Sequence, residues 1–192
     1  MNLWLRLLIY LLGYPWRPPL ASAEDTGRLT FRVWPLDLDL SLHMNNGRYL
    51  TLMDLGRLDF VVRSGLWRPI RRHGWTPIAS SIVIRYRREL MPFACFRLET
   101  RLISWAEASV VMEQTFILLS GPHAGQVAAR ALFKGGIYSR QDKSFVDTAR
   151  LMAEIGVSAT SPPMSAETEA FLKADAALKV TAAASDAGVA SQ

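Results

Sequence analysis

The stretch NGRYLTLMDLGRLDFVVRS, residues 46–64, decides the fold of this chain. We predict that it forms one helix of about five turns, with Asn45 or Asn46 as its N-cap and Gly65 at its end. At about 3.6 residues per turn, its apolar side chains cover most of the helix surface rather than one stripe. A helix that is apolar nearly all round is stable only inside a protein, so the remaining chain must surround it.

Strand-like segments follow this helix. Their alternation of apolar and polar residues, clearest in FRLETRL, and the short turns between them favour antiparallel neighbours. The four segments are residues 77–89, 94–105, 108–119 and 126–138. We therefore predict the α+β class, with residues 27–160 forming a single domain in which an antiparallel β-sheet wraps the long central helix. The segment around Trp67 and Pro69, which precedes these strands, is predicted to be a loop.

The two ends of the chain differ from this domain in composition. Residues 1–26 contain an apolar run that is too short to span a bilayer. We predict an interfacial helix, through which residues 1–20 contact a membrane surface or the fold itself. The alternative is a signal peptide that ends at the Ala-Ser-Ala of residues 21–23. Residues 161–192 are predicted to form a helix followed by a disordered tail beyond Val180.

The charged residues and the single cysteine limit the classes of partner and compartment. Arginine supplies most of the 22 basic residues, against 17 acidic ones, and its planar guanidinium suits phosphate groups. No run of five basic residues and no nucleic-acid motif occurs, so we expect no nucleic-acid partner. Cys95 is the only cysteine, so no intrachain disulfide can form, which suits a reducing compartment, and we predict that it is a small buried residue. We predict a cytoplasmic protein, associated with a membrane through its N-terminus, or an exported one if residues 1–23 are a signal peptide.

A polar turn, DLDLSLHMNNGRY of residues 37–49, leads into the predicted helix. Such a turn brings a carboxylate next to backbone N–H groups whose dipoles favour negative charge. These groups can stabilise the charge that develops on a thioester carbonyl oxygen, while the carboxylate attacks the carbonyl or activates a water. The three histidines lie far apart and lack metal-ligand spacing, so we expect no metal site and no cofactor. The turn therefore predicts a hydrolytic site.

A family resemblance rests on three runs of residues: Asp37-Leu38-Asp39, His43-Met44-Asn45-Asn46-Gly47-Arg48-Tyr49 and Asp54-Leu55-Gly56-Arg57. In this spacing they resemble the signature of the 4-hydroxybenzoyl-CoA-type thioesterases of the hotdog-fold superfamily. Within it they are most similar to the branch of thioesterase-superfamily member 6 and its bacterial relatives. The resemblance covers roughly residues 28–140. It implies a hotdog domain, a homodimer or a dimer of dimers, and hydrolysis of an acyl-CoA substrate.

The resemblance also implies roles for single residues. Asp39 matches the family's catalytic carboxylate, acting as nucleophile or general base, and the backbone N–H near Asn46 matches its oxyanion donor. Asp37 is predicted to cap the turn instead. The residues of the oxyanion turn are His43, Asn45, Asn46 and Gly47. Helix support or substrate contact is expected from Asp54 and Arg57, and CoA-phosphate contact, or a solvated strand face, from Arg85 and Arg87.

Two positions depart from the family pattern. Leu42 precedes the histidine where many relatives have Gly, and this difference can alter the backbone path through the turn. Asp54 stands where Glu is commoner, which shortens the reach of the carboxylate by one methylene. Neither departure removes the proposed catalytic carboxylate.

Two other functions remain open. A hotdog hydratase or dehydratase would use His43 with a carboxylate as its acid–base pair, although the characteristic second motif of such enzymes is missing. A non-catalytic acyl-binding or membrane-associated scaffold would keep the fold without the chemistry. The thioesterase is preferred because the motif supplies both the carboxylate and the helix start.

Overall fold

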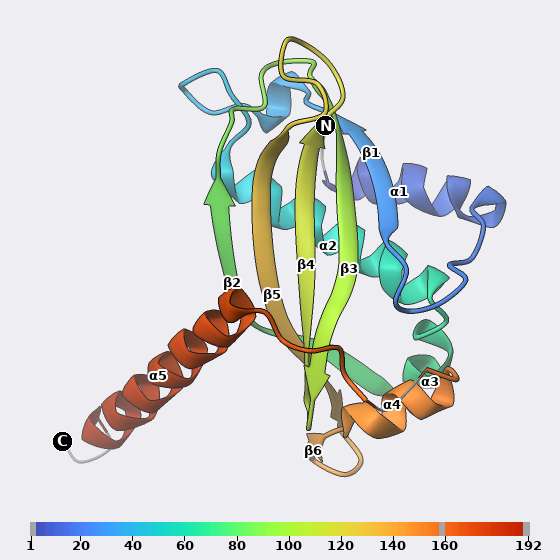
Figure 1. The fold of residues 1–192 in the computed structure, drawn as a ribbon, viewed down its shortest axis with the longest axis vertical. Helices are drawn as coiled ribbons and strands as arrows, with labels where there is room; N and C mark the ends of the chain where they lie inside the picture. Colours follow the sequence, from blue (N-terminus) through green and yellow to red (C-terminus); the bar gives the residue numbers. More distant parts are fainter. Residues whose placement is uncertain (1–2, 158–159, 190–192) are drawn as a thin grey trace.

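The chain folds as an antiparallel β-sheet curled around one long helix (Figure 1). The computed structural model describes residues 3–157 and 160–189. Within these residues the strands follow the order β1-β3-β4-β5-β2, and β6 pairs with β5. The strands are β1 (Gly27–Arg32), β2 (Trp75–Tyr86), β3 (Cys95–Ala106), β4 (Ser109–Leu118), β5 (Val127–Ser139) and β6 (Ser144–Phe145). The predicted α+β class and the antiparallel pairing are confirmed.

The central helix α2 (Asn46–Arg63) ends one residue before its predicted boundary. Its apolar side chains fill the space between the helix and the concave face of the sheet, and Leu52, Met53 and Phe60 are almost fully buried. Gly56 allows the helix to lie close to the strands, because a Cβ atom there would be 2.7 Å from the Thr100 hydroxyl oxygen. The sheet therefore packs against this helix at the distance that a glycine permits.

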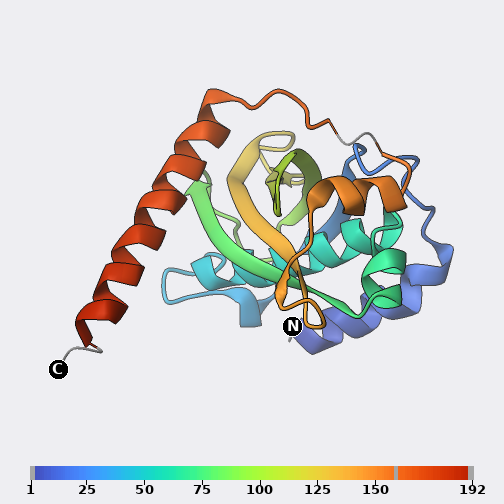
Figure 2. The ribbon, with the colours of Figure 1, turned by 90° about the horizontal axis from the view of Figure 1, so that it is seen from below.

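The N-terminal helix α1 (Leu3–Gly13) lies along α2, on the side of that helix that the sheet leaves open (Figure 2). Arg6 of α1 is buried and forms an ion pair with Asp37. Past the end of the helix, Arg17 Nη1 lies 3.1 Å from Asp59 Oδ1. One face of α1 is thus attached to the domain through charged pairs. None of the described helices is both long enough and apolar enough to cross a membrane.

The prediction of a loop around Trp67 and Pro69 is wrong, because these residues form the short helix α3 (Trp67–Arg72). Proline is tolerated in a first helical turn, where its missing N–H would have no intrahelical acceptor. Burial of Ile70 against the core then stabilises the helix. A second short helix, α4 (Thr148–Glu154), begins at its N-cap Asp147. Packing stabilises α3, whereas α4 also has a local capping signal in Asp147.

The C-terminal helix α5 (Ala166–Val189) is longer than predicted. It occupies residues 181–189, for which a disordered tail is predicted, and alanine's high helix propensity favours this continuation. Phe171 packs against the outer face of the sheet, and the far half of the helix projects from the domain (Figure 1). Residues 190–192, which complete the predicted tail, lie outside the described residues. Cys95, predicted to be buried, is half-buried at the start of β3.

Candidate active site

A tight turn connects the strand β1 to the helix α2. It begins with a short 3-10 helix over Pro35–Asp37 and closes through a bridge between Leu38 and Met44. Within the turn the Asp39 N–H donates to the His43 carbonyl at 3.0 Å, and the Leu42 N–H donates to the Asp39 carbonyl at 3.1 Å. These backbone bonds determine the direction of the side chains in the turn.

Asp37 stabilises the start of this turn. Its carboxylate accepts the Trp34 N–H at 2.9 Å, forms an ion pair with Arg6 and lies 3.8 Å from Arg48 Nε. Its side chain is only 1% exposed, so it has no room for a substrate. The capping role predicted for Asp37 agrees with this geometry.

Asp39 and His43 face each other across the turn. Asp39 Oδ1 accepts the Ser41 N–H at 2.9 Å, and Asp39 Oδ2 lies 3.4 Å from His43 Nδ1. Both side chains are 26% exposed. The Asp39 carboxylate is therefore oriented by the protein and still accessible to a ligand.

The start of α2 supplies a free backbone donor. The Asn45 side chain caps the helix by accepting the Gly47 N–H at 2.8 Å, and the Arg48 N–H donates to the Asn45 carbonyl. The Asn46 N–H has no acceptor among the described residues. Because the first N–H groups of a helix carry its positive dipole end, this donor can bind a negatively charged oxygen. Gly47, predicted to belong to the oxyanion turn, has its N–H occupied by the cap.

A tyrosine that the sequence analysis omitted also reaches the start of the helix. The Tyr86 hydroxyl of β2 donates to the Asn46 carbonyl at 3.4 Å, and its ring lies 5.0 Å from that of Tyr49. Burial raises the pKa of both hydroxyls, so they remain protonated donors at neutral pH. Strand alternation places Tyr86 on the same face as Ile84, and this pattern could have indicated the contact.

Asp54 and Arg57 lie further along α2. They form an ion pair, but the Asp54 side chain is 65% exposed whereas that of Arg57 is 13% exposed. Arg57 Nη1 donates to Gln114 Oε1 at 2.7 Å, and its guanidinium lies over the Phe133 ring. At about 1.5 Å per residue, Asp54 is roughly 12 Å from the helix start. Within one chain these two residues support the helix and do not meet Asp39.

Arg85 near the end of β2 and Arg87 just after it alternate with Tyr86 along the chain. With Arg130 they line a cavity of about 870 Å³ between the sheet and α5. Asp39 does not line this cavity. Within residues 3–157 and 160–189, no group of three or more His, Cys, Asp or Glu residues could hold a metal ion.

Comparison with known proteins places this turn and sheet in a family. The model of the thioesterase-like superfamily matches residues 33–172, which include the turn, α2 and the strands β2 to β6. The chain belongs to the thioesterase-like superfamily. Protein THEM6 of Xenopus laevis is 39% identical over 87 residues, covering 45% of this chain and 42% of the relative. Protein THEM6 of Drosophila melanogaster is 36% identical over 102 residues, covering 53% and 51%. The chain thus spans about half the length of these curated relatives.

Solved structures of other proteins show the same fold. The probable thioesterase YbaW from Escherichia coli has a TM-score of 0.61 at 23% identity, covering 67% of this chain and 94% of that one. The DHNA-CoA thioesterase from Staphylococcus aureus has a TM-score of 0.57 at 12% identity, covering 67% and 85%. These likenesses confirm the predicted hotdog architecture, with one helix inside a curled sheet.

Proposed function

We propose that this member of the thioesterase-like superfamily hydrolyses acyl-CoA thioesters to a free acid and CoA. The observation that carries the proposal is the juxtaposition within one turn of an oriented, accessible carboxylate and a free N–H at a helix start. These groups belong to Asp39 and Asn46. Family membership, which rests on the match to residues 33–172, supports the same reaction.

The proposed reaction uses the two groups on one carbonyl. The thioester oxygen accepts the Asn46 N–H, which stabilises the charge that develops there, an effect worth several kcal/mol in comparable sites. Asp39 either attacks the carbonyl carbon, forming an anhydride as the CoA thiolate leaves, or removes a proton from an attacking water. Water completes the first route by hydrolysing the anhydride. His43, 3.4 Å away, orients the carboxylate in both routes.

Thiol release from short, medium, long and aromatic acyl-CoAs tests the reaction. We expect Asp39→Asn to lower kcat by about 100-fold or more, because a positioned base typically contributes that much. Asp142→Asn is the matched control, since Asp142 accepts a bond from Ser139 near β6, away from the turn. If Asp39→Asn turns over substrate at nearly the wild-type rate, the Asp39 carboxylate does not take part in the reaction. No release above the spontaneous rate from any substrate would reject the activity.

We further propose that Arg85 and Arg87 bind the CoA phosphates, since both are exposed and share a cavity with Arg130. N-acetylcysteamine thioesters lack these phosphates and provide the test. Alanine at both positions should raise KM for acyl-CoA and leave KM for the truncated thioester unchanged. An equal rise for both substrates would contradict the phosphate contact.

The contact between Asp39 and His43 favours a second candidate, hydration of an enoyl thioester, because such a reaction needs an acid–base pair. Loss of the enoyl-CoA absorbance without thiol release would identify this hydratase. Substrate binding without either reaction, unchanged in Asp39→Asn, would identify a non-catalytic acyl-binding scaffold instead.

A further inference from the structure

The outer face of α1 is apolar and exposed. Trp4, Leu8 and Leu12 are spaced at four-residue intervals, which places them on one face, and they are 73%, 51% and 64% exposed. Other large apolar side chains of this segment are exposed as well: Leu5, Ile9, Leu11 and Trp16. An exposed apolar surface of this kind marks an interaction site. We call these seven residues the α1 apolar face.

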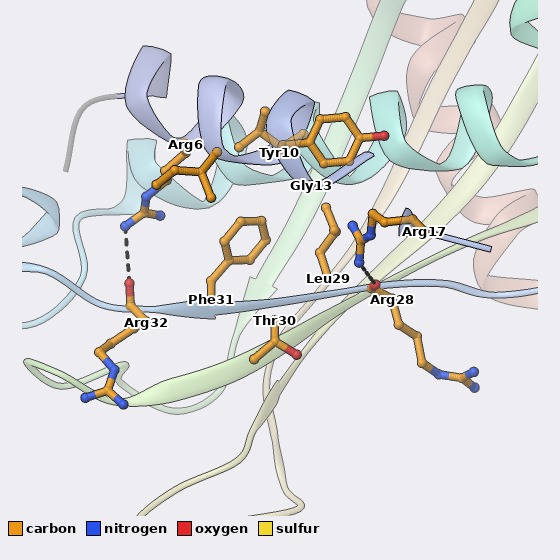
Figure 3. Close-up of a pocket in the computed structure, with 11 residues that line it drawn as sticks. Arg6, Tyr10, Gly13, Arg17, Arg28, Leu29, Thr30, Phe31 and Arg32 are labelled. Carbon is orange, nitrogen blue, oxygen red and sulfur yellow. Dashed lines mark hydrogen bonds between the residues drawn. The ribbon is translucent and has the colours of Figure 1, made fainter. Parts of the chain in front are cut away.

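Two arginines hold α1 with this face outward. Arg6 Nη2 donates to the Arg32 carbonyl and Arg17 Nη2 donates to the Arg28 carbonyl, both at 3.2 Å, so the helix is fastened along β1 at two points (Figure 3). Leu29 rises from β1 toward the helix, in a cavity of about 400 Å³ between them.

Rotation of the helix to bury the apolar face is opposed by the same contacts. It would withdraw Arg6 from Asp37, leaving a buried carboxylate with only the distant Arg48 as a charged partner. Breaking a buried ion pair in this way is strongly destabilising. The exposure of the α1 apolar face is therefore built into the fold.

The dimensions and charges of α1 fit a membrane surface. Its 11 residues span about 16 Å, roughly half of a bilayer's hydrocarbon core, so the helix can lie in the interface but cannot cross it. Trp4 and Trp16 stand near its two ends, and tryptophan is enriched at lipid interfaces. The helix contains no acidic residue, and the chain as a whole carries a formal net charge of +5 at pH 7.

We propose that the α1 apolar face inserts into the surface of an anionic membrane leaflet, to which the net positive charge of the chain is attracted. Burial of the apolar side chains supplies the attachment, and the positive charge favours anionic over zwitterionic lipid. Because Arg6 joins α1 directly to Asp37, attachment brings the Asp39 turn to the leaflet together with the helix. The proposal requires no catalytic activity and is tested separately from it.

Co-sedimentation of the full chain with vesicles tests this surface. We expect binding to vesicles of phosphatidylcholine mixed with phosphatidylglycerol, weaker binding to phosphatidylcholine alone, and weakening by salt. Leu8→Asp combined with Leu12→Asp should lower binding by at least about tenfold, because it places charge in the inserted face. The matched control combines Leu178→Asp with Val180→Asp on α5, where the native residues are 69% and 71% exposed.

The proposal is supported if the α5 control variant binds vesicles as strongly as the wild type while the α1 variant does not. Circular dichroism must show that both variants are folded. The proposal would be overturned if the wild type ignored anionic vesicles, or if both variant pairs lost binding equally. Conversion of a larger assembly to a smaller one by the Leu8 and Leu12 substitutions, without vesicle binding by the wild type, would also overturn it. The face would then bind a second copy of the chain.

Discussion

At the scale of single residues, Leu42 is the clearest local conflict between sequence and backbone. Its φ of 60° lies in the left-handed region, which costs a non-glycine residue about 1–2 kcal/mol. Its side chain is 65% exposed, so little burial of apolar surface offsets this cost. The turn therefore holds Leu42 in a conformation that glycine would adopt without this cost.

Leu42→Gly should therefore stabilise the protein by about 0.5–1 kcal/mol, because the strain that it relieves exceeds the backbone entropy that glycine loses on folding. Thermal unfolding would show a rise in Tm of roughly 1–4 °C. Leu40→Gly, in the same turn and fully exposed, is the control, since Leu40 has no positive φ. Leu40→Gly should lower the Tm. If both Leu40→Gly and Leu42→Gly lower the Tm, Leu42 is not strained.

At the scale of elements, α5 is attached to the sheet by two acidic residues, Asp175 and Glu167, of which Glu167 pairs with Arg130 of β5 at 2.7 Å. Asp175 accepts bonds from Lys134 Nζ, at 2.5 Å, and from the Ser81 hydroxyl, while Phe171 packs on Leu132. These two hydrogen bonds hold the pKa of Asp175 below its usual value. A lowered pKa in the docked state means that undocking takes up protons, so acid favours release of the helix.

We expect the attachment of α5 to be complete above the ordinary aspartate pKa of about 3.9 and to be lost as pH falls through the lowered value. Hydrogen exchange of residues 166–180, followed from about pH 6 to pH 3, would report this release. Asp175→Asn should weaken attachment at neutral pH and reduce its acid dependence, with the pair between Glu167 and Arg130 left in place, whereas Asp142→Asn should behave like the wild type. An unchanged acid profile in Asp175→Asn would show that another group controls the helix.

At the scale of the whole molecule, β2 leaves one edge of the sheet open. Among the described residues β2 pairs only with β5, and Ile82 and Val83 are exposed along it. A second copy can satisfy the free edge by antiparallel pairing, as expected for a homodimer or a dimer of dimers. We propose this assembly for the chain. Because Tyr86 lies on the same strand and touches the start of α2, pairing there would place a neighbour close to the candidate site.

Light scattering would then give a mass of at least twice 21.5 kDa. Val83→Lys should convert the assembly to monomers, because it places like charges on both sides of the paired edge. Leu119→Lys, at an exposed position just after β4, should leave the mass unchanged. A monomeric wild type at micromolar concentration would exclude β2 pairing.

Several of these features could be read from local sequence. The bounds of α2 were predicted to within one residue from an N-cap at Asn45 or Asn46 and an end at Gly65, and the predicted strand ranges were close to β2, β3, β4 and β5. Local signals of this kind depend on residues a few positions apart. The helix α3 was missed for the complementary reason: its stability comes from burial of Ile70 in the core, which no local pattern around Pro69 indicates.

By itself, the sequence determined the α+β class, the central helix and the turn that carries Asp39, because caps, periodicity and motif spacing act within short segments. Only the tertiary structure decided which distant side chains meet. Arg6 pairs with Asp37 across 31 positions, Tyr86 reaches Asn46 across 40, and Arg57 bonds Gln114 across 57. Many charged and polar residues could form such pairs, and the path of the chain around α2 selects among them.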